Sequence, residues 1–152
     1  MIMNPTAIKH VVVDGHSLTL ESFVAIARYN ATVELAPSAL EAMQKSRALA
    51  EKIAAEGRVA YGITTGFGEF QKVAVPKEMS NQLSTNLILS HCTAAGEPYA
   101  DEIVRGMMLL RANALCGGVS GVRPLLVEML LEMLNKGVTP VVPQKGSLGS
   151  SG

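Results

Sequence analysis

The predicted helix Val122–Lys136 limits the possible folds of this chain more than any other segment. Its polar residues occupy a narrow strip of a predicted helix and leave most of the circumference apolar; they are Glu128, Glu132, Asn135 and Lys136. A helix of this kind needs neighbours on several sides. The other short helices predicted here cannot supply them all, so we expect the chain to depend on further sequence or on other subunits.

Composition excludes several classes of protein. The chain has 152 residues, about one domain, and 48% of them are hydrophobic. Its longest apolar stretch contains Glu128 and Glu132, so no membrane span is predicted. The N-terminus lacks the basic and apolar regions of a secretion signal, which favours the cytoplasm.

The 13 basic and 13 acidic residues form no basic cluster, so we expect no nucleic-acid partner. His10 and His16 lack a third ligand in pattern, so no metal site is predicted.

The periodicity of apolar residues predicts a mainly α chain with a few short strands. Residues 8–18 are predicted to form a short strand, an Asp-Gly turn and the lead into a first helix, with Thr19 as its N-cap. A second helix is expected from Pro37 to a stop at Gly57, followed by an edge strand over Val59–Ile63. Three further helices are predicted, over residues 76–91, 101–116 and 122–136.

The first candidate functional segment is the glycine-rich loop Tyr61–Gly68. Its glycines permit backbone angles closed to other residues and could hold the tyrosine against a ligand. A phosphate-binding loop would need a lysine, and the segment has none. Taken alone, the segment is equally consistent with an ordinary glycine-rich turn.

Two more segments are ambiguous when each is taken alone. His91 lies near the C-terminus of a predicted helix, where a histidine commonly caps the helix or packs against it. The run Gly146–Gly152 has the composition of a flexible linker.

Together, four segments in this order and spacing resemble the histidine and aromatic amino acid ammonia-lyase family. They are Tyr61–Gly68, Asn86–Gly96, Arg111–Leu115 with Ser120–Arg123, and Thr139–Gly152. The resemblance covers nearly the whole chain from about Val13 onward. It implies that residues 1–152 are the N-terminal portion of a catalytic domain with a helical-bundle fold and an ordered glycine-rich active-site loop, the rest of the bundle being absent from this chain.

The resemblance also implies a prosthetic group made from the chain itself. The tripeptide Ser150-Ser151-Gly152 matches the family's Ala-Ser-Gly, which cyclises into 4-methylidene-imidazol-5-one (MIO). In that reaction the Gly152 nitrogen attacks the Ser150 carbonyl carbon with loss of water, and Ser151 loses its hydroxyl as a second water. Ser150 contributes only its carbonyl and backbone, so serine should be tolerated where the family has alanine.

The resemblance also implies roles for other residues of this chain, which match functional positions in the family's motifs. Tyr61 matches the catalytic tyrosine that removes the substrate's β-hydrogen as a base. A tyrosine with the ordinary pKa of about 10 needs a stabilised phenolate or alkaline conditions for that role. His91 matches the residue that contacts the substrate ring, and a neutral imidazole can bond either another imidazole or a phenol. Gly68 and Asn86 are assigned to substrate binding.

The expected function is elimination of ammonia from L-histidine to give urocanate, a carbon–nitrogen lyase reaction without a metal. Tyrosine ammonia-lyase and tyrosine 2,3-aminomutase are alternatives, and a catalytically inert helical fragment that acts only in assembly is a third. The sequence ends at Gly152 and lacks the family's second tyrosine, carboxylate-binding arginine and ring-proximal asparagine. We therefore expect the isolated chain to be inactive, with the remaining C-terminal part and a homotetramer as its partners.

Overall fold

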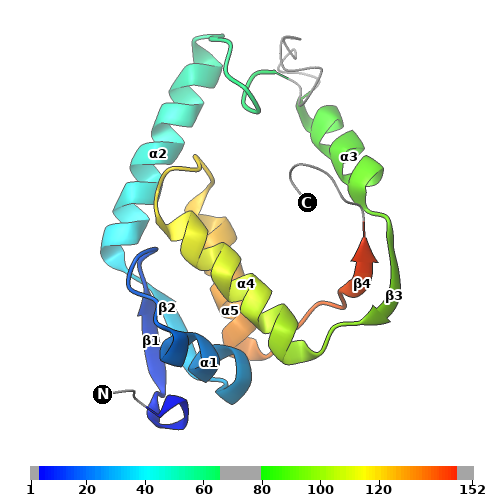
Figure 1. Cartoon of the computed structure of the whole chain (residues 1–152). Helices are drawn as coiled ribbons and strands as arrows, with labels where there is room; N and C mark the ends of the chain where they lie inside the picture. The colour runs from blue at the N-terminus through cyan, green and yellow to red at the C-terminus, as the bar shows by residue number, and fades with distance from the viewer. Residues whose placement is uncertain (1–3, 66–79, 147–152) are drawn as a thin grey trace. The chain divides into compact units, whose positions relative to one another are not determined.

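The computed structural model describes residues 4–65 and 80–146. Its elements, shown in Figure 1, are η1 (Pro5–Ala7), β1 (His10–Val13), α1 (Leu20–Tyr29), β2 (Thr32–Leu35), α2 (Pro37–Ala55), α3 (Ser80–His91), β3 (Ala94–Pro98), α4 (Asp101–Cys116), α5 (Pro124–Lys136) and β4 (Pro143–Gly146). The prediction of a mainly α chain with a few short strands is confirmed. No helix within the described ranges is long and apolar enough to cross a membrane.

The described residues divide into two compact units. The first contains residues 4–48 and 99–142, and the second contains residues 49–65, 80–98 and 143–146. Helix α2 begins in the first unit and ends in the second.

The first unit starts with a parallel pair of strands joined through α1 (Figure 1). Val11 and Val13 of β1 point inward, as the alternating pattern requires. Thr19 caps α1 as predicted, because its side chain accepts a hydrogen bond from the Ser22 amide at 3.2 Å. This cap fixes where the helix leaves the sheet.

Helices α4 and α5 complete the core of the first unit, in which Ile26, Met43 and Leu109 are fully buried. On α5 the buried residues are Val127, Leu131 and Leu134, a single stripe at helical spacing. Of the other apolar residues of that helix, Leu130 and Met133 are partly buried against the core, whereas Leu125, Leu126 and Met129 remain about half exposed. The first unit therefore covers only one side of α5, in agreement with the unusually wide apolar face of this helix.

A buried arginine joins the ends of two helices in this unit. Arg105 is only 5% exposed. Its guanidinium donates to the carbonyl oxygens of Ile26 at 2.9 Å, Ala27 at 3.2 Å and Leu134 at 3.0 Å. These carbonyls lie in the last turns of α1 and α5, where helix carbonyls lack partners within the helix. Arg105 thus satisfies both helix ends with one side chain.

We expect Arg105→Met to destabilise the first unit by about 3 kcal/mol, because buried carbonyls left without a donor each cost about 1–3 kcal/mol. Hydrogen exchange of the α1 and α5 amides measures the change, and roughly 100-fold faster exchange is expected. The matched control is Arg28→Met, which removes an exposed arginine paired with Glu102 at 2.7 Å. Near-wild-type protection is expected there, and equal effects of the two substitutions would contradict the role given to Arg105.

The second unit begins with the end of α2. The Gly57 amide bonds the Ala54 carbonyl and the Arg58 amide bonds the Ile53 carbonyl, while Gly57 has a φ of 65°. This is the pattern of a helix stopped by a left-handed glycine, and it confirms the predicted stop. Strands β3 and β4 pair antiparallel, with Ala94 opposite Gly146.

Several predicted boundaries differ from the structure. The edge strand expected over Val59–Ile63 is wrong: these residues form turns, in which the Ile63 and Thr64 amides both bond the Ala60 carbonyl. Helix α5 begins at Pro124 rather than at Val122, because proline suits the first helical position and disfavours helical angles in the residue before it. Strands β2, β3 and β4 were not located from the sequence.

Candidate active site

Tyr61 is presented by a tight turn at the end of α2. Thr64 closes this turn, since its hydroxyl accepts from the Ala60 amide at 2.9 Å and donates to the Arg58 carbonyl. Gly62, with a φ of 71°, takes the left-handed position that other residues rarely adopt. The Tyr61 side chain is 63% exposed. The Thr64 hydroxyl and the backbone bonds of this turn hold position 61 after the end of α2.

His91 is the last residue of α3 and is exposed. Its Nδ1 lies 2.9 Å from the Leu87 carbonyl oxygen and 2.8 Å from the Ser90 hydroxyl. The predicted substrate-binding residue Asn86 also lies on α3, where its side-chain oxygen accepts from Gln82 at 2.8 Å. The helix therefore carries both residues, with His91 at the end that leads to β3.

The pairing of β3 with β4 links this helix end to the predicted ring precursor. Ala94, three residues after His91, lies opposite Gly146, four residues before Ser150. A Cβ at position 146 would lie 3.5 Å from the Thr93 carbonyl oxygen, an ordinary van der Waals contact. Pro143–Gly146, which precede Ser150-Ser151-Gly152 in the chain, therefore lie beside the segment that follows α3.

The second unit contains each predicted site residue whose structure is described: Tyr61, Asn86 and His91. Gly68, Ser150, Ser151 and Gly152 lie outside the described residues. All three described residues are exposed. Because abstraction of a weakly acidic proton requires a water-excluded site, other parts of the protein must cover them if they act as predicted.

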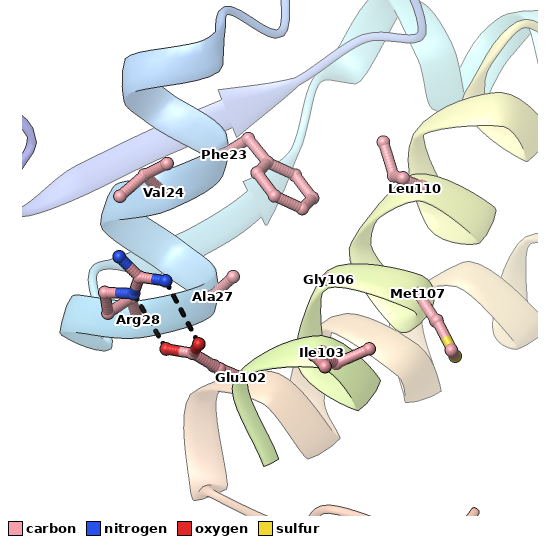
Figure 2. A pocket seen from close by; sticks show the side chains of 9 residues that line it. All are labelled: Phe23, Val24, Ala27, Arg28, Glu102, Ile103, Gly106, Met107 and Leu110. Atoms are coloured by element: carbon pink, nitrogen blue, oxygen red, sulfur yellow. Dashed lines mark hydrogen bonds and ion pairs between the residues drawn. The ribbon is translucent and has the colours of Figure 1, made fainter. Parts of the chain in front are cut away.

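A mainly apolar pocket lies between α1 and α4 of the first unit (Figure 2). It measures about 340 Å³, and apolar side chains such as Phe23, Met107 and Leu110 line most of it, with the Arg28–Glu102 ion pair at one end. None of the predicted site residues borders it. Within the described ranges no three histidine, cysteine or acidic side chains gather closely enough to hold a metal.

Ser90 was not singled out from the sequence. Its hydroxyl bonds the Leu87 carbonyl at 2.9 Å and also contacts His91. The sequence shows that Ser90 is adjacent to His91. It does not show the bond to Leu87, because that bond depends on the side-chain rotamer of Ser90.

The comparisons with known proteins agree on one family. The family model described as aromatic amino acid lyase matches residues 18–152. Histidine ammonia-lyase of Alkaliphilus metalliredigens is 50% identical over 144 residues, which are 95% of this chain and 28% of that relative. The chain therefore spans less than a third of the length of the curated relatives it matches.

Solved structures agree with the sequence relationship. Tyrosine aminomutase from Streptomyces globisporus matches with a TM-score of 0.84 at 39% identity, covering 90% of this chain and 26% of that one. Histidine ammonia-lyase from Trypanosoma cruzi matches with a TM-score of 0.81 at 37% identity, covering 91% of this chain and 26% of that one.

Proposed function

Because this chain belongs to the aromatic amino acid lyase family, we propose that it is the N-terminal portion of the catalytic domain of an ammonia-lyase that converts L-histidine to urocanate. The observation that supports this proposal is the pairing of β3, which follows His91, with β4, which precedes the tripeptide in the chain. A ring-contacting residue and an electrophile must work on one substrate, so their segments should be held together.

Similarity to histidine ammonia-lyases at about 50% identity supports histidine as the substrate. The second candidate is a tyrosine ammonia-lyase or a tyrosine 2,3-aminomutase. The structural match to tyrosine aminomutase favours it, and the exposed imidazole of His91 could bond a phenol as well as an imidazole.

The residues of the tripeptide have the chemistry that MIO formation requires. Ser150 supplies a carbonyl, Ser151 a hydroxyl that can leave, and Gly152 an amide nitrogen without a side chain to hinder it. Once formed, the group supplies an electrophile toward the substrate amine, which ordinary side chains cannot provide. Tyr61 takes the proton from the β-carbon, and His91 orients the substrate by its ring.

The remaining requirements fall to the rest of the enzyme. We propose that a group that binds the substrate carboxylate and a cover that excludes water come from outside residues 1–152, in keeping with the 28% of the relative's length that this chain spans. The exposed apolar residues of α5 provide a surface for such contacts. A homotetramer and a cytoplasmic location complete the proposal.

Intact mass tests the proposal directly. In the catalytic assembly that contains this chain, the polypeptide should weigh two waters less than its sequence requires. Ser150→Ala should show the same loss, because only the carbonyl of residue 150 reacts. An unmodified mass in an assembly that releases no ammonia would refute the lyase proposal and favour an inert helical module.

A further inference from the structure

Three atoms at the end of α3 form a close triangle. The Leu87 carbonyl oxygen lies 2.9 Å from both the Ser90 hydroxyl and His91 Nδ1, and these two atoms lie 2.8 Å apart. All three contacts are within hydrogen-bonding distance. The carbonyl oxygen can only accept, so its two short contacts require donors on Ser90 and on His91.

The arrangement selects one form of the neutral imidazole. If the Ser90 hydroxyl donates to Leu87, the proton on Nδ1 can be shared between the Leu87 carbonyl and the Ser90 oxygen, and every contact is satisfied. The opposite tautomer would place the bare lone pair of Nδ1 against a carbonyl lone pair at 2.9 Å. The hydrogen-bond network, from which a tautomer must be assigned, therefore favours a proton on Nδ1.

A neutral imidazole with its proton on Nδ1 has an unprotonated Nε2. None of the described residues bonds to this nitrogen, and the His91 side chain is exposed. The outward nitrogen of His91 is thus a hydrogen-bond acceptor.

We propose that Ser90 and the Leu87 carbonyl fix the proton of the neutral His91 imidazole on Nδ1, so that the ring contact which the family resemblance assigns to His91 is made by an acceptor nitrogen, Nε2. The inference rests on the proposed function and deepens it, because it specifies the polarity of the contact. Ser90 is a positioning residue that acts through His91. A ring without a donor would leave Nε2 unpaired in a closed site, at an energetic cost.

The first test reads the tautomer without any catalysis. In the catalytic assembly labelled with ¹⁵N at histidine, long-range ¹H–¹⁵N spectra of the neutral His91 imidazole distinguish protonated from unprotonated ring nitrogens. We expect a proton on Nδ1 in the wild type and in Ser90→Thr. Ser90→Ala should populate the other tautomer measurably, because Nδ1 loses one of its two acceptors. A proton mainly on Nε2 in the wild type would overturn the proposal.

The second test compares ring isosteres in the catalytic assembly. Histidine is paired with 3-(thiazol-4-yl)alanine, and tyrosine with 4-fluorophenylalanine; each isostere keeps the ring size and lacks the donor. We expect kcat/KM for the isostere to be lower by about 10-fold or more in the wild type and in Ser90→Thr. The ratio should fall toward unity in His91→Leu and partly in Ser90→Ala.

The outcomes separate the two levels of the proposal. Ammonia release with no preference for donor rings would overturn the assignment of His91 while leaving the lyase function intact. An unchanged ratio and an unchanged tautomer in Ser90→Ala would remove Ser90 from the role. Failure of every amino acid to release ammonia, with the proton still on Nδ1, would overturn the lyase function and not the polarity of His91.

Discussion

Ser151→Ala is expected to abolish ammonia release, the largest effect of any substitution considered for this chain. Within the proposed function, Ser151 is the only residue of the tripeptide that gives up its side chain. Alanine has no hydroxyl to lose, so the methylidene carbon that makes the group electrophilic cannot form. The substrate amine would then remain a poor leaving group, and a correctly placed base could not compensate.

Mass and absorbance separate this explanation from misfolding. The Ser151→Ala polypeptide can lose at most one water, whereas the wild type should lose two, and the near-ultraviolet absorbance of the ring should disappear. Ser147→Ala is the matched control, because it removes a neighbouring hydroxyl outside the tripeptide. Wild-type turnover in Ser151→Ala would show that another residue supplies the electrophile, and equal losses in both variants would indicate a general structural defect.

The helices of this chain are largely readable from local sequence because their ends carry explicit signals. Helix α4 runs over Asp101–Cys116 as predicted, with acidic residues in its first turn and two glycines after its last residue. Helix α2 ends as Gly57 predicts. Each of these signals acts within a few residues, so no knowledge of the tertiary structure is needed.

Strands β2, β3 and β4 were missed because they depend on partners far away in the chain. Ala94–Pro98 contains glycine and proline, which are poor strand formers, yet it forms β3 because residues near position 145 pair with it. The segment Val59–Ile63 shows the opposite error: it has strand-forming residues, but Gly62 and the Thr64 hydroxyl favour a turn. Propensity is a weak guide where pairing or a side-chain bond determines the backbone.

The same distinction between local sequence signals and structural contacts applies to the candidate site. Tyr61 and His91 were located through the order and spacing of motifs, which a sequence displays in full. The orientation of the His91 ring was not accessible, because it depends on the Ser90 rotamer and on a backbone carbonyl one turn earlier. Sequence thus indicated which residues to consider, and the structure supplied the contacts from which we infer the polarity of His91.

The second large effect is expected for Tyr61→Phe, which should lower kcat by at least about 100-fold while the electrophile still forms. Loss of a positioned general base typically costs about 10²–10⁴-fold. The substitution removes only the phenolic oxygen, and the turn that holds position 61 is closed by the Thr64 hydroxyl and backbone amides. A mass that is still two waters below the sequence value would show that the electrophile forms and that the loss is chemical.

Isotope and pH measurements distinguish a lost base from a displaced substrate. If Tyr61 removes the β-proton, its loss should make that step rate-limiting, so β-deuterated substrate should show a larger isotope effect in Tyr61→Phe than in the wild type. The limb of the pH–rate profile that reports the base should vanish as well. Tyr29→Phe, at another exposed tyrosine, is the control and should change neither quantity. A Tyr61→Phe enzyme with near-wild-type kcat would assign the base to a residue outside this turn, because the substitution leaves no ionisable group at position 61.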